Sequence, residues 1–360
     1  MSTTLKQNWW LFSPRVDLAV FLGSAVVSLL ALWIGARAGL LNGSTPDWAW
    51  IPAVLLIDVA HVYSTGFRVY LDSDELKRRP WLYVLVPTLA LVAGIMLYSQ
   101  GELTFWRVLA YLAVFHFVRQ QYGWVALYRA RCGESSKLTW WIDSVAVYMS
   151  TIYPLIYWHT NLPRRFWWFL TDDFVAIPQI VQTVALPIYY ISLIAYFAKT
   201  LYLGLGKNHW NPGKDIVLVT TAICWYVGII GYNSDYAFTV TNVIIHGVPY
   251  LALVYWYGRQ RSDEQHQKGV YRLFSDGPLG FLALLWALAY VEEMIWDRGV
   301  WHDRSWFFGQ GWDLDEFKII LVPLLALPQI THYVLDGFIW RRKKNPSFSL
   351  VSSNARGVSR

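Results

Sequence analysis

The sequence predicts an all-α, polytopic integral membrane protein with about ten transmembrane helices. Of its 360 residues, 56% are hydrophobic and 15% are charged, whereas a soluble domain carries roughly 25% charged residues. Ten stretches are long and apolar enough to cross the hydrocarbon core, which takes about 20 helical residues. The distribution of Lys and Arg between the intervening loops is a third, independent indication.

The ten predicted spans cover residues 16–41, 47–71, 80–99, 103–130, 138–159, 176–203, 214–232, 236–258, 277–297 and 316–341. Together they form one transmembrane domain over residues 1–343. Residues 344–360 are rich in Ser, Asn and Arg, a composition that predicts a disordered cytoplasmic tail.

The basic residues fall mainly in alternate loops, as expected because Lys and Arg favour cytoplasmic loops. With the N-terminus inside, 22 of the 30 Lys and Arg residues lie in inside loops or helix ends, and 6 lie outside. We therefore expect both termini on the cytoplasmic side of an inner or plasma membrane. This topology also explains the net charge of +6, so no nucleic-acid partner is expected.

Four of the eight histidines lie inside predicted spans: His61, His116, His246 and His332. All four spans run from outside to inside. Each histidine precedes the basic residue at the cytoplasmic end of its span by about 7–13 residues, or roughly 10–20 Å of helix. The four imidazoles are therefore expected to share one layer in the cytoplasmic half of the membrane.

Further polar side chains accompany these histidines on their helices. The second span carries a stripe along one helical face, namely Asp58, His61, Thr65, Arg68 and Asp72. The other three spans carry Arg119 and Gln120, Asn242, and the pair Gln329 and Asp336. A charge near the middle of a bilayer costs about 2.5–3.5 kcal/mol on insertion scales, so such groups must compensate one another or bind something.

Imidazole and carboxylate ligands together suit iron, zinc or manganese, and helical bundles hold di-iron sites with inward-facing pairs one turn apart. We therefore predict a metal site whose ligands are His61, His116, His246, His332, Asp58 and Asp336. The expected occupant is iron, as two ions, with another transition metal as the alternative. The side chains expected to orient these ligands are Thr65, Arg119, Gln120, Asn242 and Gln329; Arg119 is also a candidate counter-ion for an aspartate.

The segments that carry these residues read DVAHVYSTGFRVYLD (58–72), HFVRQQYGWVALYRAR (116–131), NVIIHGVPYLALVYWYGR (242–259) and PQITHYVLDGFIWRR (328–342). They resemble the His-bearing helices of integral-membrane non-haem iron oxygenases. The nearest analogues are the Brp/Blh-type carotene-cleaving dioxygenases; membrane fatty-acid desaturases and hydroxylases, whose HxxxH and HxxHH boxes are absent here, are more distant. The resemblance implies oxygen-dependent oxidation of a membrane lipid or isoprenoid, with a cytoplasmic electron donor where the reaction needs one.

Other interpretations of the same residues stay open. An intramembrane histidine often only joins two helices by a hydrogen bond. A haem protein would use the four histidines as axial pairs, and a proton-coupled transporter would use the stripe from Asp58 to Asp72 together with Arg119. A membrane acyltransferase would use Asn242 and His246 as catalytic partners, with the histidine as general base.

Overall fold

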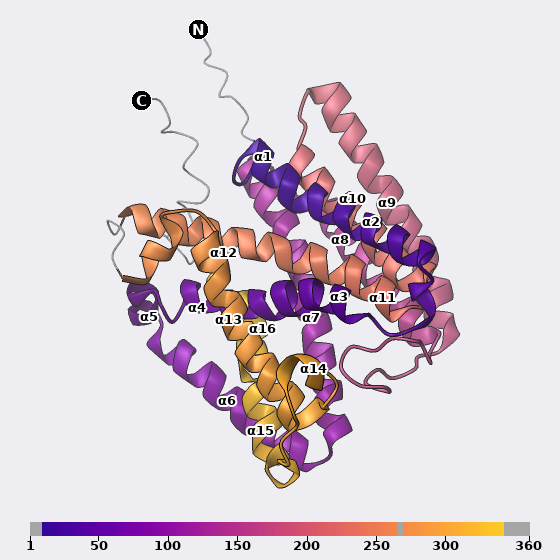
Figure 1. Cartoon of the computed structure of the whole chain (residues 1–360). Helices are drawn as coiled ribbons and strands as arrows, with labels where there is room; N and C mark the ends of the chain where they lie inside the picture. Colours follow the sequence, from indigo (N-terminus) through magenta and orange to yellow (C-terminus); the bar gives the residue numbers. More distant parts are fainter. Residues whose placement is uncertain (1–8, 265–268, 342–360) are drawn as a thin grey trace.

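The computed structural model describes residues 9–264 and 269–341 (Figure 1), and these residues contain helices, turns and loops but no β-strand. Each of the ten predicted spans coincides with a helical stretch. The all-α class is therefore confirmed. The tail expected at residues 344–360 lies outside the described residues.

The first five stretches run from the N-terminus to residue 160. They are α1–η1–α2 (Pro14–Asp17, Leu18–Gly23 and Ser24–Arg37), α3–η3–α4 (Asp47–Trp50, Ile51–Val59 and Ala60–Arg68), α6 (Pro80–Ser99), α7 (Glu102–Arg131) and α8 (Lys137–Thr160). The other five are α9 (Gln179–Lys207), α10–η4 (Pro212–Gly231), α11–η5–α12 (Asp235–Phe238, Thr239–Val243 and Ile244–Glu264), α13–η7 (Leu279–Trp301) and η8–α15–α16 (Asp315–Phe317, Lys318–Leu325 and Leu327–Ile339). Short helices in the connections are η2 (Leu40–Asn42), α5 (Ser73–Arg78), η6 (Gly269–Phe274) and α14 (Ser305–Phe308).

Eight of these stretches are long and apolar enough to span a membrane. The two that are not are α7 and α8, with 30 and 24 residues. Both are long enough, but α7 carries His116, Arg119 and Gln120, and α8 carries Asp143, so their mean hydropathy is lower. The structure is thus consistent with a multi-pass membrane protein that has at least these eight spans.

The helix ends are marked by residues that satisfy free backbone N–H groups. Ser13, Ser136 and Ser234 accept such hydrogen bonds at the starts of α1, α8 and α11. Asp72 caps α5 in the same way, through the N–H groups of Asp74 and Glu75. Because serine and aspartate are favoured at this position, the capping residues fix where each helix begins.

Loops that are far apart in the sequence meet at two opposite ends of the bundle. One end joins the loops that are rich in Lys and Arg: Arg261 pairs with Asp72, Arg131 donates to the Trp10 carbonyl, and Asn211 donates to Glu134. The other end joins the remaining loops: Arg165 donates to Asn42, Thr45 donates to Asp235, and Arg304 pairs with Asp47. Spans that alternate in direction place successive loops at opposite ends of the bundle, and the loops are grouped in this way here.

Asp143 lies at the basic end and is the centre of a buried ion cluster. Its carboxylate accepts from Arg129, Lys199 and Lys214, which come from α7, α9 and α10. Removing one partner from such a cluster leaves an uncompensated buried charge. The cluster therefore ties three helices to α8 at the basic end of the bundle.

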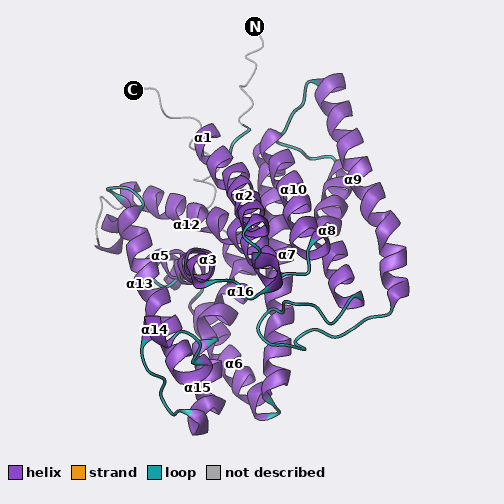
Figure 2. Ribbon diagram, turned by 45° about the vertical axis from the view of Figure 1, so that its right-hand side comes forward, coloured by secondary structure: helices purple, strands orange, loops and turns teal. Residues whose placement is uncertain are grey.

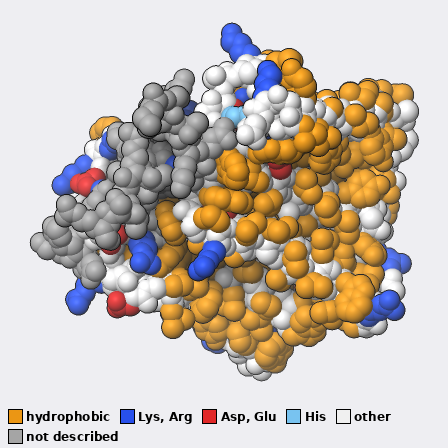
Figure 3. Space-filling model, turned by 90° about the horizontal axis from the view of Figure 1, so that it is seen from above, with side chains coloured by type: hydrophobic (Ala, Val, Ile, Leu, Met, Phe, Trp, Pro, Cys, Tyr) orange, Lys and Arg blue, Asp and Glu red, His pale blue; other side chains and the backbone are white. Residues whose placement is uncertain are grey.

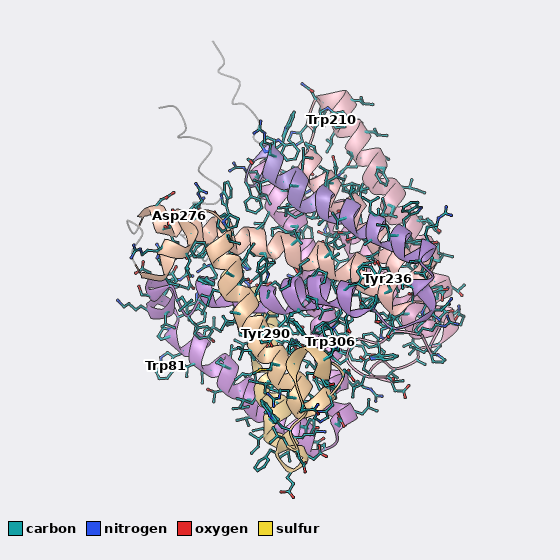
Figure 4. All side chains as sticks on the ribbon, viewed as in Figure 1. Trp81, Trp210, Tyr236, Asp276, Tyr290 and Trp306 are labelled. Atoms are coloured by element: carbon teal, nitrogen blue, oxygen red, sulfur yellow. The ribbon has the colours of Figure 1, made fainter. Side chains whose placement is uncertain are left out.

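The arrangement of the helices agrees with an apolar environment. Figure 2 shows α7, α8 and α10 side by side, with α9 along the outer edge against α8. In Figure 3, the part of the face that is not drawn in grey is covered largely by apolar side chains. Figure 4 places Trp81 at the start of α6 and Trp306 in α14, and both rings are exposed, as aromatic side chains at membrane interfaces are.

Candidate metal centre

The four intramembrane histidines meet in the interior of the bundle. His61 comes from α4, His116 from α7, His246 from α12 and His332 from α16, and all four side chains are buried. The four helices pack against one another, α4 and α7 each against both α12 and α16. The shared depth expected from the sequence is therefore realised as contact between the rings.

The contacts between the rings form a closed cycle. The Nε2 atoms of His61 and His246 are 3.1 Å apart, and so are those of His116 and His332. Around the cycle the ring centroids are separated by 4.8 Å (His61–His246), 5.1 Å (His246–His116), 4.6 Å (His116–His332) and 4.9 Å (His332–His61). Within each of the two close pairs, the ring nitrogens that face each other are both Nε2.

Two π-helical segments lead into the centre. Segment η3 (Ile51–Val59) ends two residues before His61 and contains Asp58, and η5 (Thr239–Val243) ends three residues before His246 and contains Asn242. A π-helical turn shifts the register of the side chains that follow it, and such turns are frequent at functional sites. These segments help to set the rotation at which His61 and His246 face each other.

A close helix approach brings His246 towards His61. Gly247 follows His246, and a Cβ atom there would lie 2.5 Å from Ile57 Cγ2 and 3.2 Å from the Ile57 carbonyl oxygen. Only a residue without Cβ leaves room for this approach. Gly247 thus allows α12 and η3 to pack at the distance that the two histidines need.

Three of the four rings have a polar group behind them, on the Nδ1 side. His61 Nδ1 lies 3.5 Å from Asp58 Oδ1, and His116 Nδ1 lies 3.8 Å from Asp336 Oδ2. His332 Nδ1 is 2.7 Å from the Thr65 hydroxyl. Of these contacts only that of Thr65 is a hydrogen bond, because His61 Nδ1 and Asp58 Oδ1 have no hydrogen-bond partner among the described residues. Metal-binding histidines characteristically donate such a bond, which sets the tautomer and the orientation of the ring.

The two aspartates have different surroundings. Asp336 accepts hydrogen bonds from Tyr250 Oη at 2.6 Å and from Trp340 Nε1 at 3.0 Å, so its carboxylate is held behind His116. Asp58 is one of three residues, with His61 and His246, whose ligand atoms all lie within 4.8 Å of one another. A second such group consists of His61, His116 and His332.

The five residues expected to orient the ligands are placed differently. Thr65 contacts His332 directly, and Gln120 donates to the His246 carbonyl at 3.1 Å. Asn242 donates to its own helix, at Phe238 O and Thr241 Oγ1. Within the described residues, Gln329 has no hydrogen bond to the four rings.

Arg119 does not reach Asp58 or Asp336 as a counter-ion. Its side chain is exposed, donates a hydrogen bond to the Tyr148 hydroxyl and lies over the ring of Tyr122. Arg119 therefore does not contact the histidines or the aspartates beside them.

Three aromatic residues around the histidines had not been expected. Phe117 stacks on His246 with a centroid distance of 3.5 Å, and Tyr333 stacks on His116 at 4.8 Å. The Tyr250 hydroxyl is 3.0 Å from that of Thr65. Tyr250 follows His246 by one helical turn, so i, i+4 spacing was a signal for it; Phe117 and Tyr333 each follow a histidine directly, and no spacing rule points to them.

Two histidines outside the predicted intramembrane set, His159 and His302, lie apart from the centre. His159 contacts the Leu155 carbonyl at 2.6 Å and the Tyr111 hydroxyl at 3.1 Å, near the end of α8. His302 lies in a turn with a positive φ of 60°. Among the residues that the structure describes, neither belongs to a group that could hold a metal ion.

Comparison with known proteins adds no assignment, because no family model, no curated protein and no solved structure matches this chain. The arrangement of the site is therefore the basis for a functional proposal.

Proposed function

We propose that the four histidines bind one transition-metal ion through their Nε2 atoms and that the chain is a membrane-embedded oxidoreductase. Iron is the metal that the resemblance to non-haem iron oxygenases favours, and imidazole ligands suit it. The substrate class is a lipophilic molecule, a lipid or an isoprenoid, that reaches the site from the membrane.

The observation that carries the proposal is the closed cycle of four buried imidazoles. Four nitrogens placed tetrahedrally about 2.1 Å from an ion would lie about 3.4 Å apart, close to the 3.1 Å of the two Nε2 pairs. Within the described residues, the ligand atoms that all lie within 4.8 Å of one another form groups of three, so the His246 ring must move towards His116 and His332 to complete a site with four histidines.

Hydrogen bonding between the histidines is the simpler alternative, since each pair could share one N–H···N hydrogen bond. It does not explain why two such pairs lie against each other. Metal binding would also give a role to the Thr65 hydroxyl, which is hydrogen-bonded to His332 Nδ1, and to the two aspartates that lie on the Nδ1 side of His61 and His116.

The number of ions distinguishes two versions of the site. In the version proposed here, Asp58 and Asp336 hold the rings from behind and are not ligands. The sequence suggested two ions with both aspartates bound, and the group formed by Asp58, His61 and His246 is the place for a second one. A metal-to-protein ratio of one supports our version.

The geometry favours a bare ion over haem. Axial histidines on the two faces of a haem need their nitrogens about 4 Å apart with the flat macrocycle between them, and here the paired Nε2 atoms are 3.1 Å apart. An acyltransferase pair is also disfavoured, because Asn242 donates to its own helix and His246 Nε2 faces His61. A proton-coupled transporter is disfavoured too, because Arg119 lies on the outer surface of the bundle and not beside the stripe from Asp58 to Asp72.

The surrounding residues suit oxidation of an apolar molecule. Phe117 and Tyr333 cover two of the rings, and such apolar walls exclude water from a reaction site. Activation of dioxygen is the chemistry that bound iron would supply. Thr65 and Asp336 would keep their imidazoles oriented, and a cytoplasmic donor would be needed only if the reaction consumes electrons.

The proposed topology has both termini in the cytoplasm, based on the 22 inside and 6 outside basic residues. In an inner or plasma membrane, the histidine layer then lies roughly 10–20 Å of helix from the cytoplasmic ends of its four spans. Membrane lipids surround the bundle, and a soluble donor would approach its basic end.

Elemental analysis of the purified protein tests the proposal. Wild type should contain about one transition-metal ion per chain, and replacing any of the four histidines by alanine should lower that content. His159→Ala is the matched control, because this buried histidine makes two hydrogen bonds away from the centre. Wild type without metal, or equal loss in the control, would overturn the proposal.

A further inference from the structure

A second polar feature lies on the outside of the bundle, between α7 and α8. Arg119 is exposed, and about 18 Å of helix separate it from the end of α7 at Arg131. Half the thickness of a hydrocarbon core is about 15 Å. If α7 lies across the membrane, its guanidinium is therefore near the middle of the bilayer, where an arginine without a counter-charge is costly.

The neighbours of Arg119 do not supply that counter-charge. Its guanidinium has five N–H groups, donates to the Tyr148 hydroxyl and lies 4.9 Å from the centroid of the Tyr122 ring. Both neighbours are neutral, and Arg119 belongs to no ion pair in the part of the chain that the structure describes.

The two tyrosines are arranged to donate hydrogen bonds of their own. Their rings are stacked, with centroids 5.1 Å apart and planes 11° apart. The Tyr148 hydroxyl accepts from Arg119, and the Tyr122 hydroxyl accepts from Trp140 Nε1 at 3.2 Å. A hydroxyl that accepts one hydrogen bond keeps its own O–H to donate, so a guanidinium and two phenols form a set of donors.

An apolar surface continues from this set of donors towards the other end of α7. Phe115, one helical turn before Arg119, is 62% exposed. The exposed apolar side chains nearby on the two helices are Val108, Tyr111, Phe115, Val145 and Ile152. On α7, Val108, Tyr111 and Phe115 lie on neighbouring turns of one face, so they form an exposed apolar strip next to Arg119.

We infer that Arg119, Tyr122 and Tyr148 bind the carboxylate of a long-chain lipid acid whose chain lies along this apolar surface. The guanidinium fork matches the two oxygens of a carboxylate. A phospholipid phosphate stays at the interface, whereas a carboxylic acid can reach the middle of the bilayer in its neutral form. This inference does not depend on the metal centre.

Direct binding of radiolabelled oleate tests the inference. The protein is placed in nanodiscs of phosphatidylcholine, and saturable binding is measured. Arg119→Gln should weaken binding at least about tenfold, because a charge-assisted bidentate pair is lost. Arg37→Gln is the matched control, since Arg37 is also exposed and lies over an aromatic ring, that of Trp33; it should leave binding unchanged.

Further variants and competitors sharpen the test. Tyr148→Phe removes only a hydroxyl and should weaken binding about threefold, which keeps the inference testable if Arg119→Gln does not fold. Methyl oleate, which has no carboxylate, should not compete. Unchanged binding in Arg119→Gln, or equal competition by methyl oleate, would overturn the inference. Displacement by phosphatidylglycerol at the same concentration would assign the anion to a phospholipid and overturn it too.

Discussion

Replacing Gly247 by alanine should disturb the proposed metal centre without changing any ligand. The new Cβ atom would lie 2.5 Å from Ile57 Cγ2 and 3.2 Å from the Ile57 carbonyl oxygen, whereas ordinary contacts begin at 3.4 Å. The Ile57 side chain, or α12 and η3 themselves, must therefore give way by about 1 Å, and overpacking of this kind costs about 1–3 kcal/mol.

The same displacement reaches the histidines. His246 precedes Gly247, and its Nε2 atom is 3.1 Å from that of His61. Metal sites tolerate deviations of about 0.2 Å in ligand distances. A shift of the size that Gly247→Ala requires exceeds this tolerance, so the variant should retain less metal than wild type, as well as unfold more easily.

The assay compares thermal unfolding and metal content in detergent for Gly247→Ala and a matched control, Gly66→Ala. Gly66 is a helical glycine on α4, and a Cβ there meets nothing within 4 Å. Alanine should therefore stabilise that helix by about 0.5–1 kcal/mol. If Gly247→Ala is as stable and as metal-rich as Gly66→Ala, the close approach of the two helices does not set the site.

Three further predictions address the orientation of the ligands, the basic end and the topology. Thr65→Val removes the hydrogen-bond partner of His332 Nδ1, so it should lower metal affinity about 10–100-fold in a chelator competition. Thr88→Val, on the surface of α6, is the control. Equal affinity in wild type and Thr65→Val would contradict this role of Thr65. Burial raises the pKa of Asp72, but hydrogen bonds from Tyr257 and Arg261 outweigh it and hold that pKa below its usual value. The ionised Asp72 carboxylate therefore stabilises the fold above a pH of about 4, and this stabilisation is lost as the pH falls through the lowered pKa. Denaturation curves of Asp72→Asn should show a smaller loss of stability in acid than those of wild type. Identical pH profiles for the two proteins would contradict this role of Asp72. A reporter fused after Arg360 that works only outside the cytoplasm should stay silent, and activity there would contradict the proposed topology.

The positions of the helices and the depth of the histidines followed from the sequence because both depend on distance along one chain. Hydropathy located each apolar stretch, and the rise per residue placed His61, His116, His246 and His332 in one layer. The predicted polar stripe on the second stretch runs from Asp58 to Asp72. His61, Thr65, Arg68 and Asp72 are buried, whereas Asp58 is partly exposed.

The contacts between side chains of different helices could not be predicted from the sequence, because they depend on how each helix is rotated about its axis. The π-helical segments before His61 and His246 shift the register, and ideal helical spacing does not include such shifts. The sequence could not distinguish an Asp336 that binds an ion from one that lies on the Nδ1 side of His116. Arg119 follows His116 by three residues, yet it lies on the outer surface.

X-ray absorption spectroscopy of the purified protein at the edge of its bound metal tests the central claim most directly. One ion held by four histidines predicts nitrogen neighbours at about 2.0–2.1 Å, with the outer-shell scattering of imidazole rings. A second metal at about 3.5–4 Å, or a shell made mainly of carboxylate oxygens, would contradict the single four-histidine site.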